Sequence, residues 1–400
     1  MKANRPYHNE KGIALITSLL FMAIVSILGT TAYLTASNEM TISSNYRLAK
    51  KAFYDAEAGV NYTLAGIEAA LADGSLNLTG DSVSVNYAAP SGFSFDTVTT
   101  LTRVSGTSNY QFQVTGNAAG GRCTLEVVIA RDSVLQFGVF GDEEVDMKSN
   151  ASVYSYDSRT TANPTPDDST HEADVGSNEK VVVHNGTNID GNVGLGAQED
   201  GTDAVLDSTG TPTIYGSTQD LSRVDPDPMG AVGGSLAADF ITYSASNDNA
   251  SAGIAGDIIS LGNGESLTLE AGNYYLTDIT LHNGATLQID AGLGPVNIYL
   301  TGGLEAKNGS SVNITGLPTE FTIFSNSTDK IVLKHGGTFK GTIYAPYAEI
   351  EMKNGSDAYG LLWGKTIDIK NSGEFYFDTA LKEKWLANTV SVVSWKDTRY

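Results

Sequence analysis

Hydrophobic residues follow two different patterns along this 400-residue chain, and the change comes near residue 136. Ile13 to Ala36 is an uncharged, largely apolar run, and the next charge is Glu39. A helix of about 20 apolar residues spans a bilayer core, so this run is long enough to do so. Beyond it, apolar residues recur every three or four positions at Ala56, Val60, Leu64, Ile67 and Leu71. The two patterns together predict one helix from Ile13 to Ala72, and Gly74 suits the position just past its end.

Residues 75–135 alternate between apolar and polar positions, as a half-buried antiparallel sheet does. Residues 110–115 and 123–128 read as two strands, and the Gly-containing segment 117–121 reads as the loop of a hairpin. Cys123, the single cysteine, falls in the second strand, where we expect a buried small hydrophobic residue. An intermolecular disulfide is the alternative.

Residues 136–385 contain short apolar strands, such as residues 286–290, 311–315 and 366–370, separated by similar polar turns. The turns begin with Lys or His and continue with Asn, Ser or Gly, in the segments 148–150, 184–186, 282–284, 307–309, 335–337, 353–355 and 370–373. A repeat of about 20 residues with short β-branched strands is typical of a solenoid. We therefore predict a mainly-β domain that forms a right-handed parallel β-helix, with an antiparallel sandwich as the alternative.

Residues 141–230 are rich in Asp, Asn, Ser, Thr and Gly, a loop-like composition, so we expect them to be acidic loop insertions between early coils or a partly disordered surface. Residues 378–387 are predicted to form a short helix that covers the open end of the coil. Residues 386–400 then form a C-terminal tail or strand.

The N-terminal residues come in an uncommon order, because the basic residue Lys11 and then Gly12 stand directly before the apolar run. A secretory signal peptide has a shorter apolar segment and a small-residue cleavage site after it, and neither fits here. A plain N-terminal anchor followed by a linker is the simplest alternative to a specialised leader.

The segment from Glu10 to Ile16 resembles the processing site of type IV prepilins, and residues 37–40 and 45–59 resemble the PilX N-terminal domain of pilus assembly proteins. The resemblance implies a leader of residues 1–12, cleavage between Gly12 and Ile13, and N-methylation of Ile13. It also implies a long pilin helix over residues 13–74, with residues 13–36 in the membrane, on a small antiparallel sheet. The N-terminal part is thus expected to be an α+β pilin-like unit.

Two positions bear on the role within this family. Thr17 would be the fifth mature residue, where major pilins carry a Glu that pairs with the N-terminal amine of a neighbouring subunit. A subunit with Thr17 cannot neutralise that buried amine, which suits a subunit that enters first or is used sparsely. Glu39, the first charge after the apolar run, belongs to the segment that carries the PilX resemblance.

The net charge of −22 is unevenly distributed, since the first 60 residues carry six Lys or Arg and four Asp or Glu. The basic leader fits the cytoplasmic side of the inner membrane, with the acidic remainder periplasmic. A strongly acidic body disfavours nucleic acid as a partner, because phosphate binding needs clustered Lys and Arg.

The sequence shows no established catalytic or metal-binding pattern, and residues 224–398 contain no Arg, which disfavours a polysaccharide-lyase site. Calcium is the one candidate ion, on the oxygen-rich segments 200–203, 225–227 and 247–249. We therefore expect no enzyme and no required cofactor.

Residues 341–381 resemble an uncharacterised β-helical domain found fused to PilX-type N-termini, which brings no activity with it. The sequence is thus interpreted as a minor pilin for type IV pilus assembly or priming, placed at the filament tip, with a β-helical domain for adhesion or partner binding. The implied partners are other minor pilins, the major pilin, the prepilin peptidase and a tip adhesin, first in the inner membrane and then at the pilus and cell surface. The alternatives are a carbohydrate-active enzyme on a pilin-like anchor and a membrane-tethered binding module.

Overall fold

The computed structural model describes residues 10–78, 80–105, 107, 109–133, 135–229 and 235–398. The chain divides into two compact units: unit 1 contains residues 1–132 and 388–400, and unit 2 contains residues 133–387. Residues 1–9, which make up most of the predicted leader, lie outside the described residues.

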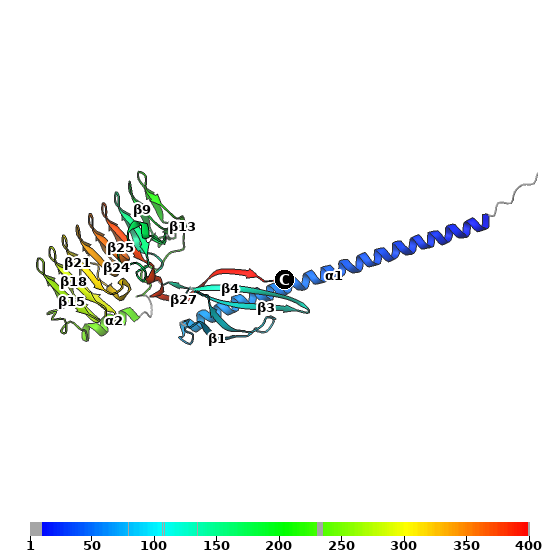
Figure 1. The fold of residues 1–400 in the computed structure, drawn as a ribbon, viewed down its shortest axis with the longest axis horizontal. Coiled ribbons are helices and arrows are strands. Elements are labelled where there is room, and N and C mark those ends of the chain that lie inside the picture. Colours follow the sequence, from blue (N-terminus) through cyan, green and yellow to red (C-terminus); the bar gives the residue numbers. More distant parts are fainter. Residues whose placement is uncertain are drawn as a thin grey trace, which may run out of the picture. The chain divides into compact units, whose positions relative to one another are not determined.

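Unit 1 is built on one long helix, α1 (Glu10–Ala72), as the apolar spacing predicts (Figure 1). At 1.5 Å per residue its 63 residues extend roughly 95 Å. The helix ends where expected, since Gly74 has a φ of 75° and the Leu76 amide donates to the Ala70 carbonyl at 2.9 Å. A glycine with positive φ just past the last turn is a common helix terminator.

The second half of α1 packs on a five-stranded sheet with the order β1-β2-β3-β4-β27. The pairs β1–β2, β2–β3 and β3–β4 are antiparallel, which confirms the predicted small antiparallel sheet. The strands are β1 (Ser82–Tyr87), β2 (Val98–Arg103), β3 (Tyr110–Ala118), β4 (Gly121–Ser133) and β27 (Leu386–Asp397). The C-terminal segment, left open above as a tail or strand, thus adds an edge strand to this sheet beside β4.

Small residues let α1 and β3 approach closely. A Cβ built on Gly116 of β3 would lie 2.0 Å from the Ala52 carbonyl oxygen of α1, and one on Gly59 would lie 2.5 Å from Val114 Cγ1. Ala52 and Ala56 on the same helix face are fully buried. Only glycine at 116 is compatible with this backbone separation, whereas a side chain at 59 would displace the Val114 and Phe95 side chains.

Unit 2 contains a 22-stranded sheet, and the strand pairings described within it are parallel (Figure 1). From β14 to β21 each strand pairs with the strand three places further along the chain. Strands β18 and β21 have the residues predicted from the sequence. The first strands are β5 (Val139–Met147), β6 (Ser152–Tyr156), β7 (Val175–Ser177), β8 (Lys180–Val183), β9 (Asn188–Ile189), β10 (Val193–Leu195), β11 (Val205–Ser208), β12 (Thr213–Ile214) and β13 (Thr218–Asp220).

The remaining strands follow helix α2 (Ser235–Ala245), whose Leu236 and Phe240 are buried. They are β14 (Ile258–Leu261), β15 (Ser266–Glu270), β16 (Gly272–Leu276), β17 (Asp278–Leu281), β18 (Thr286–Asp290), β19 (Val296–Leu300), β20 (Leu304–Ala306), β21 (Ser311–Thr315), β22 (Phe321–Ser325), β23 (Ile331–Leu333), β24 (Thr338–Met352), β25 (Asp357–Ile369) and β26 (Glu374–Asp378). Three short 3₁₀ helices are η1 (Pro166–Asp168), η2 (Pro318–Glu320) and η3 (Thr379–Glu383).

The stack does not follow the order of the chain. Strands β25 and β26, near the end of unit 2, pair in parallel with β5 and β6 at its beginning. Strands β7 to β13 extend the stack beyond β5 and β6, and β14 to β24 extend it on the other side. At this junction the Trp363 ring of β25 stacks on the Phe140 ring of β5, with centroids 4.2 Å apart.

Two expectations for unit 2 need correction. Strands β5 to β13 run through residues 139–220, so much of the acidic segment is strand and not loop insertion. Some of its strands are only two residues long, and its loop-like composition gave no signal that predicted them. The segment 378–387 does contain η3, but this helix follows β26, which lies between β25 and β6 inside the stack. Therefore η3 covers no end of it.

Candidate functional site: the exposed apolar face of the N-terminal helix

The first half of α1 exposes its large apolar side chains. From Ile13 to Leu34 they are between 46% and 72% exposed. By length and composition this helix could cross a membrane, and no part of its apolar window is buried in the protein. A buried core helix is therefore excluded, although a signal sequence would pass the same test of length and composition.

Hydroxyl groups along this half bond to their own helix. Thr17 Oγ1 donates to the Ile13 carbonyl at 3.0 Å, and Ser18 Oγ donates to the Leu15 carbonyl at 2.9 Å. Thr30, Thr31 and Thr41 make the same bond to the carbonyl four residues earlier. A hydroxyl satisfied in this way needs no water, so these residues are compatible with an apolar surrounding.

The four residues singled out from the sequence all lie on α1. Gly12 and Ile13 lie in its first turns, Thr17 follows one turn later, and Glu39 is an exposed residue roughly 33 Å further along the helix. The structure therefore does not bring Thr17 and Glu39 together. Among the described residues, Glu39 has no ion-pair partner. Cleavage after Gly12 and methylation of Ile13 stay predictions.

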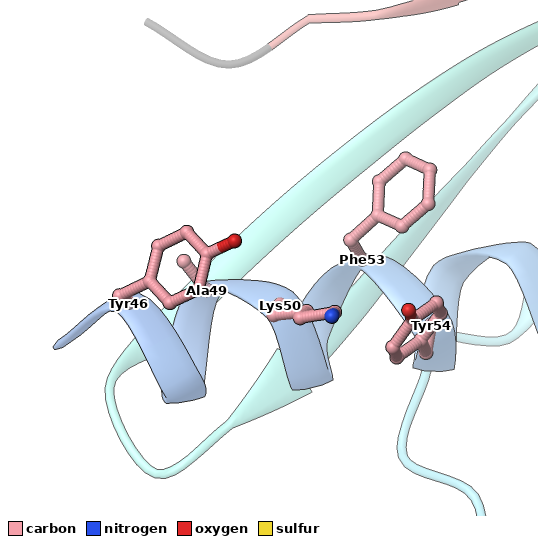
Figure 2. A pocket seen from close by; sticks show the side chains of 5 residues that line it. All are labelled: Tyr46, Ala49, Lys50, Phe53 and Tyr54. Carbon is pink, nitrogen blue, oxygen red and sulfur yellow. The ribbon is translucent and has the colours of Figure 1, made fainter. Parts of the chain in front are cut away.

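Two surface pockets lie along the middle of α1, and the sequence analysis did not predict them. One, of about 360 Å³, is lined by Tyr46, Ala49, Lys50, Phe53 and Tyr54. Figure 2 shows these side chains on successive turns of the helix, with Lys50 Nζ 5.6 Å from the Tyr54 ring centroid.

The second pocket, of about 230 Å³, is lined by residues of α1 between positions 57 and 64 and by Val392 and Trp395 of β27. Phe53 lines the first pocket and Trp395 lines the second, and their ring centroids are 6.2 Å apart. The apolar residues Val392, Val393 and Trp395 were the sequence feature that could have predicted the β27 side of this pocket.

Cys123 lies in β4 and is 1% exposed, as expected for a buried small hydrophobic residue. Its Sγ lies 3.6 Å from Asp397 Oδ1 of β27. Because the thiol is covered by β27, the alternative of an intermolecular disulfide would require this edge strand to move.

In the oxygen-rich segments considered for calcium, side-chain oxygens accept hydrogen bonds from nearby backbone amides. Asp200 Oδ1 accepts from the Thr202 amide at 2.9 Å, and this bond with that from the Thr202 hydroxyl lowers the Asp200 pKa. Asp225 Oδ1 accepts from the Asp227 amide, and Asn247 Oδ1 from the Asn249 amide. Within the part of the chain that the structure describes, no group of three or more His, Cys, Asp and Glu could hold a metal ion. These side chains therefore act as turn residues.

The Lys and His residues of the repeated turns form a column of ion pairs along one corner of unit 2. Lys353 and Lys370 both pair with Glu351, at 2.9 and 3.0 Å, and Lys307 and Lys334 both pair with Glu305. The column continues across the junction of β25 and β5, where Lys370 pairs with Asp368, and Lys148 and His184 lie against Asp146.

The turns at this corner also bond directly to each other. The Gly284 amide donates to the Asn308 carbonyl at 3.2 Å and the Gly309 amide to the His335 carbonyl at 3.0 Å. The Ser372 amide donates to the Ser149 carbonyl across the junction at 3.3 Å. The ion pairs and the bonds between turns give the repeated turn composition a structural role.

Comparison with known proteins agrees with the two-part organisation. Residues 11–61 match the family described as PilX N-terminal, and residues 277–384 match a domain of unknown function, DUF7305. No curated protein matches the sequence.

Three solved structures resemble the fold, all distantly. The competence-associated pilin ComZ from Thermus thermophilus is 11% identical over 88% of this chain and 98% of its own, with a TM-score of 0.30. The ice-binding protein from the Antarctic ascomycete Antarctomyces psychrotrophicus is 15% identical over 61% of this chain and 97% of its own, with a TM-score of 0.34. A glycosylated ice-binding protein from an Arctic yeast is 13% identical over 62% of this chain and 94% of its own, with a TM-score of 0.30. Likenesses at these TM-scores carry no conclusion about what this chain binds.

The family match covers the apolar half of α1 and the start of the half that packs on the sheet, ending two residues after the Gly59 contact. A single exposed apolar helix with this match fits a membrane-anchored pilus protein that associates with other pilins. Residues 11–61 of this chain are thus similar to the N-terminal segment of PilX-type pilus proteins, and residues 277–384 are similar to a domain of unknown function.

Proposed function

We propose that the protein is a minor pilin that is cleaved between Gly12 and Ile13, methylated at Ile13 and extracted from the inner membrane into a type IV pilus. The observation that carries this proposal is the fully exposed apolar face of α1 from Ile13 to Leu34. Side chains of this kind are stable in lipid and equally stable against the helices of other subunits, because both surroundings exclude water. The prepilin peptidase, the major pilin and other minor pilins are the partners that this step requires.

Thr17 supports a place at the tip or a sparse use in the shaft. Its hydroxyl bonds to its own helix and carries no charge, so it cannot neutralise the N-terminal amine of a neighbour. We expect Thr17→Glu to raise the number of copies along the shaft, counted by immunogold labelling of sheared filaments. Unchanged labelling would remove this argument for the tip.

Unit 2 is proposed to be a right-handed parallel β-helix that the pilus displays for adhesion or for binding a partner such as a tip adhesin. Support comes from the parallel pairing of each strand from β14 to β21 with the third strand after it and from the bonds between successive turns. The domain would face the periplasm before assembly and the cell exterior afterwards. We assign it no catalytic activity, because the charged residues of its corner are used in ion pairs.

The test is the N-terminal residue of the protein, determined by mass spectrometry in membranes and in sheared filaments, with and without the prepilin peptidase. We expect N-methylated Ile13 in the filaments and its loss without the peptidase. A matched pair of variants, Gly12→Arg and Ser43→Arg, separates processing from added charge, since only the first should block cleavage. A filament protein that still begins at Met1 would overturn the proposal, and a membrane protein absent from filaments would favour a tethered binding module.

A further inference from the structure

A polar cavity of about 250 Å³ lies in unit 2, where neither the family match nor the proposed assembly role assigns a site. Tyr156 at the end of β6 lines it together with Ser158 and Asn163 of the following segment, and the segment after β21 contributes Leu317 and Pro318. Lys340 of β24 completes the lining. The cavity thus combines apolar walls with an ammonium, a hydroxyl and an amide.

Lys340 is unusual because it has no carboxylate partner. Among the described residues of unit 2, every other Lys and Arg except Lys384 lies within 4.0 Å of an Asp or Glu oxygen. Lys384 instead donates to the Thr319 carbonyl and to Thr322 Oγ1. Lys340 Nζ lies 5.2 Å from the Tyr359 ring centroid, a contact that holds the cation in place and leaves its hydrogen-bond donors available.

Ser158 adds a second group with unused bonding capacity. The residue is 7% exposed, and its Oγ has no hydrogen-bond partner in the described part of the chain. Its backbone is fixed, because the Ser158 amide donates to Asp378 Oδ1 at 3.1 Å. A buried hydroxyl without a partner is uncommon in a stable fold, and rotation about one bond would let it meet a ligand.

Two of the nearby carboxylates are already engaged. Asp157 pairs with Arg159 at 2.7 Å, and this bond lowers the Asp157 pKa. Glu320 Oε2 accepts from the Leu317 amide at 3.0 Å.

Asp378 is the other carboxylate at this place: its Oδ1 accepts from the Ser158 and Ala380 amides, and its Oδ2 has no hydrogen-bond partner in the described part of the chain. Burial raises the Asp378 pKa and so disfavours its charged form. Locally, therefore, Lys340 is the main charge that a ligand in the cavity would meet, although the chain as a whole is acidic.

We propose that this cavity binds one acidic sugar unit, a uronic acid residue of a surface or secreted polysaccharide. Its carboxylate would pair with Lys340, its hydroxyls would meet Ser158 and the Asn163 amide, and its ring would lie against Leu317 and Pro318. The volume is below the roughly 300–1,000 Å³ of pockets for drug-sized ligands, so it suits one ring and not an extended chain. This inference does not depend on cleavage or filament placement.

The test is calorimetric titration of the full-length protein in detergent with glucuronate and galacturonate, and with glucose and galactose as neutral counterparts. We expect at least one uronate to bind at least tenfold more tightly than its neutral counterpart. Lys340→Gln should weaken that binding by about tenfold or more, since a charge-assisted hydrogen bond is lost, and Ser158→Ala by a few-fold. Raising the salt concentration should weaken uronate binding to the unaltered protein.

The matched control is Lys365→Gln, which removes a lysine of the same unit that pairs with Glu143 at 3.0 Å away from this cavity lining. It should leave uronate binding unchanged, and thermal unfolding of each variant establishes that the fold is retained. The proposal is overturned if neither uronate binds, if uronate and neutral sugar bind equally, or if a folded Lys340→Gln protein binds as before.

Discussion

The two units differ in whether they bury or expose their large apolar side chains. Unit 2 places its largest ones, such as Trp363, Phe321 and Phe339, inside the stack, where they are fully buried. Unit 1 buries a smaller core between α1 and β3 and leaves the apolar first half of α1 uncovered. A long uninterrupted exposed apolar face is not found on monomeric soluble proteins without a partner.

The two units also differ in how many of their lysines and arginines are paired with a carboxylate. In unit 2 nearly all described lysines and arginines are paired within the unit, so its corner is complete without a partner. In unit 1, Arg47 and Lys50 on the exposed side of α1 have no carboxylate within 4.0 Å among the described residues. This difference fits the proposal that other molecules cover part of unit 1.

We expect the largest effect on stability at the junction of β25 and β5 in unit 2. Trp363→Ala removes a fully buried indole, its stacking on Phe140 and its 2.7 Å hydrogen bond to the Pro226 carbonyl. We expect a loss of about 3–5 kcal/mol in the free energy of unfolding of unit 2. Urea titration followed by circular dichroism measures it, and Leu293→Ala, at a residue 92% exposed, is the control. A loss equal to that of the control would mean that this junction does not hold the stack together.

A charge on the exposed half of α1 should affect the membrane and not the fold. Leu20→Arg is expected to disfavour insertion by about 3 kcal/mol, because a charge at the centre of a membrane helix is costly. Leu20 is 62% exposed, so thermal unfolding in detergent should not change. Membrane flotation measures the effect, and a variant that floats as well as Leu20→Ala would contradict the interpretation of this half as a membrane helix.

The close approach of helix and sheet in unit 1 can be tested by adding one methyl group. Gly116→Ala should destabilise unit 1 by about 1–3 kcal/mol, since the new Cβ would lie 2.0 Å from the Ala52 carbonyl oxygen. Gly80→Ala is the control, because the nearest atom to its Cβ would be 3.5 Å away. Hydrogen exchange of α1 amides near Ala52 gives the local readout, and equal protection in both variants would show that the helix can move aside at little cost.

The smallest effect is expected at the corner of unit 2. Lys334→Met removes the hydrogen bond that chiefly lowers the pKa of Glu305. The two side chains are 30% and 39% exposed, so solvent screening limits the loss to below about 1 kcal/mol. Because the Glu305 pKa is lowered in the folded state, its contribution is present above about pH 4.5 and is lost as the pH falls through the folded value. The difference in stability between the unaltered protein and the variant should therefore be larger at pH 7 than at pH 3; a difference independent of pH would assign it to packing.

Local patterns in the sequence predicted the local parts of the fold. The spacing of Ala56, Val60, Ile67 and Leu71 located the buried face of α1, and alternation located β3, β4, β18 and β21. The pairing of β25 with β5 was out of reach, because it joins residues more than 200 positions apart and no local pattern encodes it. The cavity at Lys340 was missed for the same reason, since its walls come from three separate segments. The place of β27 beside β4 also depends on residues far apart in the sequence.

The position of β25 and β27 has a consequence for how the chain is delivered. When a chain emerges with its N-terminal end first, β5 and β6 form an open edge until residues 357–378 arrive, and β4 stays an open edge until residues 386–397 arrive. Open strand edges invite wrong pairing, so residues 357–397 protect both units from aggregation. A chain that stops before residue 357 lacks both protecting strands. Residues 357–397 must therefore fold before the edges of β4, β5 and β6 are covered.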